Sequence, residues 1–306
     1  MNDPNIKNTA PIAVFVYKRP DHAKRTLEAL AANDLASDSD LFIFSDGPKD
    51  ENARAGVQQV REFIHTVKGF RSVTIKESET NQGLAKSLIA GITELCDRFG
   101  RVIVVEDDIL THHGFLRFMN EGLEKYKDNE EVFSICGFWP LKYRQGDNKA
   151  FFMKTQACWG WATWKRAWDF YDYNASGWTE LLEDKRLAWD FDLQGRYSYT
   201  SLLLLQVQQD IQSWAIQWYW IIFSMGGLNL FPPYGLTVNI GFDGLSTHTA
   251  GNSEYDRIMR NIDLSIDAPI IMPDNCDVDE KKHESYAVSM MTMENPLPVS
   301  ARPDFM

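Results

Sequence analysis

Three consecutive carboxylates, Glu106, Asp107 and Asp108, directly follow the apolar run 102–105. A continuous β-branched run of this kind is typical of a strand buried on both faces of a parallel sheet. Adjacent anions at a buried strand end repel one another, and a hard divalent cation with oxygen ligands relieves that repulsion. Strand alternation places Glu106 and Asp108 on one side and Asp107 on the other, so we expect only one or two of them to contact a metal. A solvated acidic turn is the alternative interpretation.

The composition excludes several classes of protein. The 306 residues are 44% hydrophobic and 24% charged, with a net charge of −12. This charge argues against a nucleic-acid-binding protein and against broad electrostatic attachment to an anionic membrane. It fits a protein whose anionic ligand arrives with a metal ion. No apolar run is long enough to span a bilayer, and residues 1–5 lack the features of a signal peptide, so we expect a cytoplasmic protein.

Strand and helix patterns alternate through the first 135 residues. Strands are expected at about 11–17, 41–44, 72–76, 102–105 and 132–137, and helices from about 20, at 51–67, at 81–99 and at 114–126. In the third helix Leu84, Leu88, Ile92 and Leu95 are spaced for burial on one face. This alternation predicts the α/β class, with a mostly parallel central sheet covered by helices.

The second half has a different composition. All ten tryptophans lie between Trp139 and Trp220, where we expect helices at about 180–189 and 202–223. Short strands are expected at about 229–232 and 236–240. From about residue 268 onward, prolines stand among polar residues, which favours an extended C-terminal tail.

Several motifs carry a family resemblance. Asp46 ends the second expected strand, the segment 81–83 precedes a helix, and the acidic motif ends the fourth strand. Together with the segments 158–168, 213–218 and 239–248, they resemble the GT-A glycosyltransferases. The likeness is closest to bacterial polysaccharide glycosyltransferases related to the N-acetylglucosaminyltransferase I that begins complex N-glycan branching.

The resemblance implies a Rossmann-like nucleotide-diphospho-sugar transferase fold with an aromatic-rich acceptor half. Residues 1–267 would form one GT-A domain, with 11–135 as the nucleotide-binding half and 136–267 as the acceptor half. Residues 268–306 would form the tail.

The resemblance also implies roles for individual residues. The donor would be a UDP-sugar, with Mn²⁺ or Mg²⁺ bridging its two phosphates. Asp108 would be the direct metal ligand, while Glu106 and Asp107 would contact ribose, sugar hydroxyls or metal-bound water. The end of the first strand would line the base and ribose, and Asp46 would accept a hydrogen bond from the uracil N–H. That strand end comprises Val16, Tyr17, Lys18 and Arg19.

Each donor-side residue has an alternative interpretation. Asp46 could satisfy backbone groups of its own turn, and Arg19 could lie on the surface instead of holding a diphosphate. Asn81 and Gly83 belong to a segment resembling a damaged P-loop, in which Thr80 and Ala85 occupy the two glycine positions. Lys86 could point at the ligand or at solvent.

The aromatic half offers further candidates. We expect Trp159, Gly160 and Trp161 near the diphosphate-sugar or the acceptor, because glycine lets a backbone approach a ligand and indole faces suit sugar C–H surfaces. Filling of the core is the alternative for the tryptophans. His248 could contact the metal or a phosphate, or help a loop close over the donor.

A carboxylate must take the proton from the acceptor hydroxyl. Asp210 is the first choice, although Gln212 could occupy the corresponding position, and Asp243 is the second choice. The predicted function is a metal-dependent, inverting glycosyltransferase. It would move a sugar from UDP-GlcNAc or another UDP-hexose to a glycan hydroxyl in bacterial surface polysaccharide synthesis, with peripheral association at a membrane-bound acceptor. A nucleotide-hydrolysing NTPase and a non-catalytic carbohydrate-binding protein are the alternatives.

Overall fold

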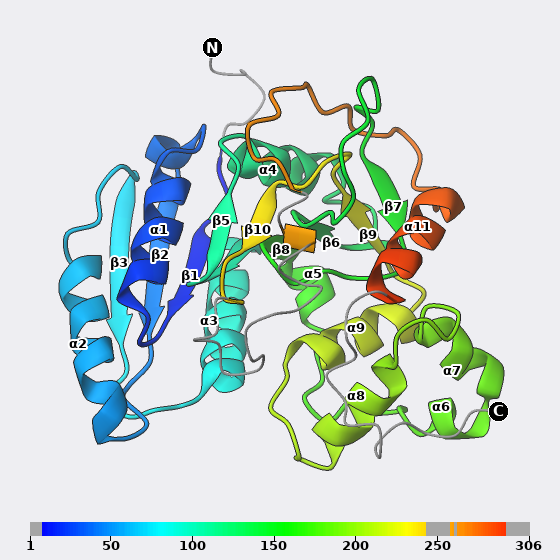
Figure 1. Ribbon diagram of the computed structural model, residues 1–306, viewed down its shortest axis with the longest axis horizontal. Helices are drawn as coiled ribbons and strands as arrows, with labels where there is room; N and C mark the ends of the chain where they lie inside the picture. Colours follow the sequence, from blue (N-terminus) through cyan, green and yellow to red (C-terminus); the bar gives the residue numbers. More distant parts are fainter. Residues whose placement is uncertain (1–7, 243–257, 260–261, 292–306) are drawn as a thin grey trace.

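A computed structural model describes residues 8–242, 258–259 and 262–291 (Figure 1). Its centre is an eight-stranded sheet in the order β3-β2-β1-β4-β8-β6-β9-β7. The strands are β1 (Ile12–Val16), β2 (Asp40–Ser45), β3 (Ser72–Glu77), β4 (Arg101–Glu106), β6 (Val132–Cys136), β7 (Phe151–Met153), β8 (Trp161–Trp164) and β9 (Leu228–Phe231). A separate two-stranded ribbon joins β5 (Ile109–Thr111) to β10 (Thr237–Asn239).

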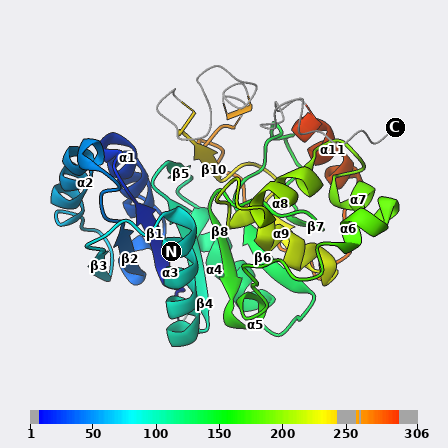
Figure 2. The ribbon, with the colours of Figure 1, turned by 90° about the horizontal axis from the view of Figure 1, so that it is seen from below.

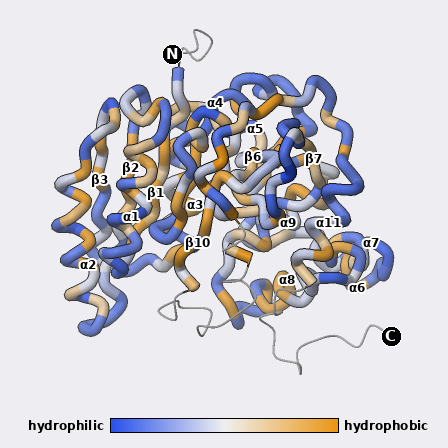
Figure 3. Tube along the Cα trace, turned by 45° about the horizontal axis from the view of Figure 1, so that its top comes forward, coloured by the Kyte–Doolittle hydropathy of each residue, from blue (hydrophilic) through white to orange (hydrophobic). Residues whose placement is uncertain are grey.

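Helices cover both faces of the sheet. On one face α1 (Pro20–Ala31), α2 (Glu51–Ile64) and α4 (Phe115–Lys125) pack on β1, β2 and β4. On the other face α3 (Leu84–Phe99) and α9 (Ala215–Ser224) pack against the alternate side chains of the same strands (Figure 2). Hydrophobic stretches follow the central strands, and hydrophilic ones lie mostly at the periphery (Figure 3). The alternation of faces places neighbouring strand residues in different cores, as the pleat requires.

The α/β class and the mostly parallel sheet are confirmed. The parallel pairings are β1–β2, β1–β4, β2–β3 and β6–β9. The strand β8 runs antiparallel to β4, with Val104 opposite Trp161. Because of this reversal, the start of β8 lies at the same edge of the sheet as the end of β4. Among the residues that the structure describes, no helix has the length and hydrophobicity needed to cross a lipid bilayer.

Three details of the helical prediction are wrong. Leu84 is 46% exposed, because it is the first residue of α3 and lies beyond the sheet that covers Leu88 and Ile92. The single helix expected at 202–223 is divided into α8 (Tyr199–Val207) and α9. Between them Gln209 has a φ of 64°, in the left-handed region that ends a helix.

The helix expected at 180–189 is also divided, into α6 (Glu180–Glu183) and α7 (Lys185–Phe191). Asp184 caps the second piece by accepting hydrogen bonds from the backbone N–H groups of Arg186 and Leu187. A short helix α5 (Lys165–Trp168) follows β8.

The segment from residue 268 is extended only as far as 279. Its Ile271 and Val278 make single β-bridges with Lys149 and Phe152. The helix α11 (Glu280–Met291) then packs Tyr286 against the core, so the expectation of an extended tail is wrong for 280–291. The pattern of this helix is weak, and its burial comes from tertiary contacts with the aromatic half.

Asp192, which follows α7, supplies a pH-dependent contribution to stability. It is 8% exposed, and its Oδ1 accepts a 2.6 Å hydrogen bond from the Thr200 N–H. Burial raises the pKa of Asp192 to about 6, although the bonds from Thr200 oppose the shift. A carboxyl whose folded-state pKa is raised stabilises the fold at low pH, and this contribution is lost as the pH rises through the folded pKa.

We therefore expect Asp192→Asn to remove most of this dependence. The free energy of unfolding of the wild type should fall relative to the variant by on the order of 2–3 kcal/mol between pH 4 and pH 7. Urea denaturation of both proteins at each pH measures the difference. A difference that stays constant with pH would contradict the assignment.

Candidate active site

The acidic motif pairs with an arginine from a different part of the chain. Arg19, just before α1, donates through Nη2 to Asp107 and to Asp108 Oδ2, the latter at 2.7 Å. Asp107 Oδ2 also accepts from the Tyr17 N–H at 3.4 Å. The side chains are 23% exposed for Arg19, 7% for Asp107 and 13% for Asp108. Arg19 is thus paired with two of the three acids and does not lie free on the surface, while its expected contact with a diphosphate stays a prediction.

Glu106 has no hydrogen-bond or ion-pair partner among the described residues. Burial, then Asp108 and Asp107, raise the pKa of Glu106 well above its ordinary value, while Arg19 opposes them. Burial also raises the pKa of Asp107, again against Arg19. Burial lowers the pKa of Arg19, but the two aspartates outweigh it and raise the pKa overall. One guanidinium therefore does not compensate three neighbouring carboxylates, and the raised pKa values of Glu106 and Asp107 show the cost of ionising all three without a further cation.

The residues present fit a divalent cation that is shared with a diphosphate. Within the described parts of the chain, no group of three or more His, Cys, Asp or Glu side chains is arranged to hold a metal alone. Glu106 and the second oxygen of Asp108 offer oxygen donors without a protein partner in those parts. Mg²⁺ commonly binds through one or two carboxylates plus the phosphates of a substrate. His248 and Asp243 lie outside the described residues.

The segment 239–241 covers the acidic motif. The Ile240 N–H donates to the Asp108 backbone oxygen at 2.8 Å, and Asn239 Oδ1 accepts from the Gly241 N–H at 2.7 Å. A Cβ on Gly241 would lie 2.2 Å from Asp108 Oδ2 and 3.0 Å from Arg19 Nη1. Gly241 belongs to a motif recognised in the sequence, but its contact with Asp108 could not be predicted, because β10 pairs with β5 only in the folded chain (Figure 1).

We expect Gly241→Ala to disturb the acidic motif. The added methyl group must displace the Asp108 carboxylate or the backbone, at a cost of about 1–3 kcal/mol in the free energy of unfolding. Thermal and urea denaturation measure this cost. As a matched control, Gly100→Ala also places a methyl group but has open space around it. Because Gly100 has a φ of 76°, that control reports backbone strain without a clash. Full stability of Gly241→Ala would show that Asp108 is not held as described.

Asp46 connects the end of β2 to the loop before α3. Its Oδ1 accepts from the N–H groups of Gly47 and Gln82, both at 2.8 Å. Its Oδ2 accepts from the Gly83 N–H at 2.9 Å and from Asn81 Nδ2 at 3.0 Å. The carboxylate is therefore fully used as a clamp, which supports the alternative that Asp46 satisfies backbone groups. A contact with uracil stays a prediction.

The loop between α8 and α9 contacts the loop before α3. A Cβ on Gly83 would lie 3.4 Å from Gln212 Oε1, so the Gln212 side chain lies against this glycine. Asp210 is exposed in the same loop, and its backbone N–H donates to the Leu205 oxygen at 2.9 Å. Lys86 is exposed on α3, as the solvated alternative expects. Gln212 therefore lies next to the loop 81–83 in the folded chain, although the two are far apart in the sequence.

The three aromatic-motif residues have separate environments. Trp161 is fully buried in β8 and stacks on Trp214 with ring centroids 5.3 Å apart, which supports the alternative that it fills the core. Its place near a ligand stays a prediction. Gly160 has a φ of 75°, and a Cβ there would lie 2.6 Å from Thr237 Cγ2. Gly160 therefore allows the close approach of β10, and its place near a ligand stays a prediction. Trp159 is half-buried, and its backbone oxygen accepts from Thr237 Oγ1 at 2.6 Å.

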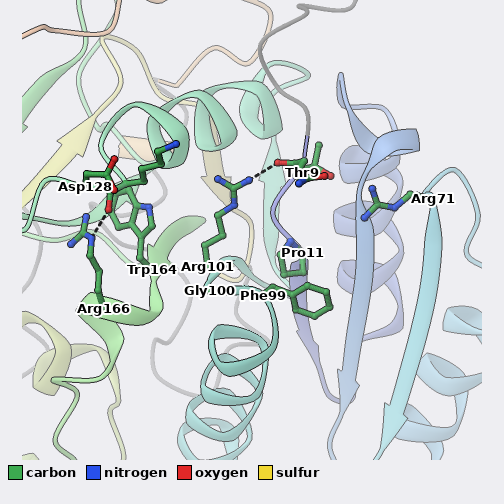
Figure 4. A pocket seen from close by; sticks show the side chains of 11 residues that line it. Thr9, Pro11, Arg71, Phe99, Gly100, Arg101, Asp128, Trp164 and Arg166 are labelled. Carbon is green, nitrogen blue, oxygen red and sulfur yellow. Dashed lines mark hydrogen bonds between the residues drawn. The ribbon is translucent and has the colours of Figure 1, made fainter.

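A cavity lies at the opposite ends of the central strands, where β1 and β4 begin. It has a volume of about 520 Å³ and is lined by Phe99, Arg101, Trp164 and Arg166, among others (Figure 4). Arg101 pairs with Glu124, and Arg166 donates to the backbone oxygens of residues 126, 127 and 132. In open α/β sheets ligands bind outside the carboxyl ends of the strands, so this cavity is not the counterpart of the acidic site.

No protein-family model matches the sequence. No curated protein matches it. Among solved structures, the mannosyltransferase PcManGT from Pyrobaculum calidifontis, in complex with GDP-Man and Mn²⁺, is 12% identical with a TM-score of 0.34; the match covers 53% of this chain and 46% of that chain.

TarS from S. aureus is 16% identical with a TM-score of 0.29, over 44% of this chain and 22% of that one. A UDP-glucose pyrophosphorylase complexed with UDP-glucose is 10% identical with a TM-score of 0.30, over 53% and 79% respectively. The chain spans less than half the length of the first two proteins. Overlaps at this level carry no argument about what the chain does.

Proposed function

We propose that this chain is a metal-dependent, inverting glycosyltransferase of the GT-A kind. It would move a sugar from a UDP-sugar, such as UDP-GlcNAc or another UDP-hexose, to a glycan hydroxyl in bacterial surface polysaccharide synthesis. It would act in the cytoplasm, with peripheral association at a membrane-bound acceptor.

The observation that supports this proposal best is the convergence of distant motifs at one edge of the sheet. The acidic motif contacts the segment 239–241, and Trp159 is bonded to Thr237 of the strand leading into that segment. Gln212 lies against Gly83, in the loop clamped by Asp46. All these segments meet where the carboxyl ends of β1, β2 and β4 open, which is the position where α/β sheets bind ligands.

On the donor side, Asp108 and Glu106 would hold the cation together with the diphosphate. Bound there, a cation would stabilise the charge that develops on the leaving diphosphate. Arg19 holds the carboxylates of Asp107 and Asp108 in place through its hydrogen bonds. Val16 and Tyr17 would line the base and ribose beside Asp46, and Asn81, Gly83 and Lys86 would border the same donor site.

On the acceptor side, a carboxylate would take the proton of the attacking hydroxyl. Asp210 is exposed in the loop that borders Gly83, which is consistent with this role. Asp243 remains the second candidate, and His248 a candidate contact to the diphosphate. One displacement at the anomeric carbon would invert its configuration.

The NTPase alternative loses support from the loop before α3. A P-loop directs its backbone N–H groups at phosphates. Here the N–H groups of Gln82 and Gly83 donate to the Asp46 carboxylate instead. A phosphate would have to displace an anion that already satisfies them.

The direct test is incubation of the protein with a panel of UDP-sugars, with and without Mn²⁺, with release of UDP as the readout. We expect slow hydrolysis of one donor that requires Mn²⁺ and is abolished by EDTA. Release of phosphate from ATP or GTP would favour the NTPase. Sugar binding that persists in EDTA without any nucleotide binding would favour a carbohydrate-binding protein.

A further inference from the structure

A small aromatic cavity in the second half is not used by the donor site. It has a volume of about 180 Å³ and lies between the segment 156–159, α8, α9 and α11. Its walls include Phe138, Trp159, Tyr199 and Tyr286. Pockets for drug-sized ligands are roughly 300–1,000 Å³, so this one has room for only part of a substrate.

The cavity contains a buried amide that lacks a partner. Gln156 is 7% exposed and lines the cavity, and its Nε2 has no hydrogen-bond partner within the described parts of the chain. Leaving such a donor unsatisfied costs about 1–3 kcal/mol. Buried polar groups are normally bonded, so an orphan amide in a cavity indicates a ligand that offers it an oxygen.

The side chains that line the cavity disfavour a charged ligand. It contains tyrosines, other aromatic and aliphatic side chains, Ser213, Cys158 and Gln156, but no Asp, Glu, Lys, Arg or His. An ion would lose its hydration there without gaining a counter-charge, which is costly. Aromatic faces accept the C–H surface of a sugar ring, and one amide orients a hydroxyl or carbonyl oxygen.

The cavity also borders the donor site on two sides. On one side, Trp159 lines the cavity and its backbone oxygen accepts from Thr237 of β10, and the segment that follows this strand bonds to the Asp108 backbone. On the other side, Ser213 lines the cavity and follows Gln212, whose side chain lies against Gly83. A sugar held in the cavity would therefore lie beside the donor site and near the loop that carries Asp210.

We propose that this cavity is the acceptor subsite and that it takes an uncharged sugar unit, bonded by Gln156 and packed on Trp159. The inference rests on the proposed function, since only a transferase has an acceptor. It also gives α11 a role, because Tyr286 and Met290 form one wall of the subsite.

The test measures the binding of monosaccharide probes by saturation-transfer NMR and titration calorimetry. The neutral probes are the methyl glycosides of glucose and N-acetylglucosamine, and the charged probes are glucuronic acid and glucose 6-phosphate. We expect at least one neutral probe to bind and the charged probes to bind at least about tenfold more weakly. In Gln156→Leu, binding of the neutral probe should weaken about five- to tenfold.

Two further readouts separate a ligand contact from a structural role. Gln156→Leu removes an unsatisfied donor, so its free energy of unfolding should be unchanged or higher, and Mn²⁺-dependent hydrolysis of the UDP-sugar should persist. Gln156→Met, with an unbranched side chain, is the second variant if the leucine does not fit. Gln58→Leu on the exposed face of α2 is the matched control for the substitution.

Equal binding of charged and neutral sugars would overturn the subsite, and so would binding of the neutral sugar that does not change in Gln156→Leu. In either case, Mn²⁺-dependent hydrolysis of a UDP-sugar would still support the transferase. Neutral binding that depends on Gln156, in a protein that hydrolyses no nucleotide sugar, would overturn the acceptor role and the proposed function together.

Discussion

Replacing Asp108 with Asn should lower Mn²⁺-dependent hydrolysis of the donor by about 10³-fold. The amide keeps the shape of the side chain but removes the negative charge that a divalent cation requires. The fold should survive, because Arg19 still pairs with Asp107. Release of UDP measures the activity, and the thermal shift produced by Mn²⁺ together with UDP measures the cation site independently.

Asp97→Asn provides the matched control for this substitution, since Asp97 is an exposed aspartate that pairs with Lys165. It should leave both readouts unchanged. Full activity of Asp108→Asn would remove the acidic motif from the mechanism. Loss of activity together with loss of the folded state would instead assign Asp108 a structural role.

Arg19→Met should give the largest loss of stability. Methionine retains part of the aliphatic stem but leaves Asp107 and Asp108 without their cation. Removing one partner of a buried ion pair costs about 3–5 kcal/mol in the free energy of unfolding. Arg54→Met on α2, which breaks an exposed pair with Glu51, should cost less than about 1 kcal/mol.

Two rescues identify the cause of that loss. Adding Asp107→Asn to Arg19→Met should recover much of the stability, because the buried charge is gone. Mn²⁺ should stabilise Arg19→Met more than it stabilises the wild type, since the acids no longer have a competing cation and ligand binding adds to folding free energy. Equal destabilisation in the single and double variants would show that the stem of Arg19 matters more than its charge.

Much of the fold was predictable because its first half is built from local patterns. The strands β1 to β4 and the helices α1 to α4 each carry their own period and were predicted, whereas the short strand β5 was not. The divided helix at 199–224 was not, because Leu202, Leu203 and Trp218 continue an apolar pattern across the break. What ends α8 is the backbone conformation at Gln209 and the hydrogen bond from the Ser213 N–H to Gln206 Oε1. Neither feature changes the hydrophobic pattern of the sequence, so neither could be predicted from it.

The candidate site was predictable in its location but not in its pairings. The acids, Asp46 and the loop 81–83 were expected at adjacent strand ends, and they lie there. The burial of Trp161 could not be predicted, because a tryptophan beside a glycine gives the same sequence pattern whether it faces a ligand or the core. Gln156 and Gly241 show their importance only through what surrounds them, a cavity for one and a carboxylate for the other.

The pairing of Asp108 with residues 240 and 241 has a consequence for the order in which the molecule is made. Strands β1 to β4 associate through neighbouring lengths of chain, so a growing polypeptide can bring Arg19 and the acids together early. The backbone that covers them is synthesised much later, after the whole aromatic half. The edge of the sheet that carries the acidic motif is therefore covered late, and in a nascent chain its charged side chains stay open to water until then.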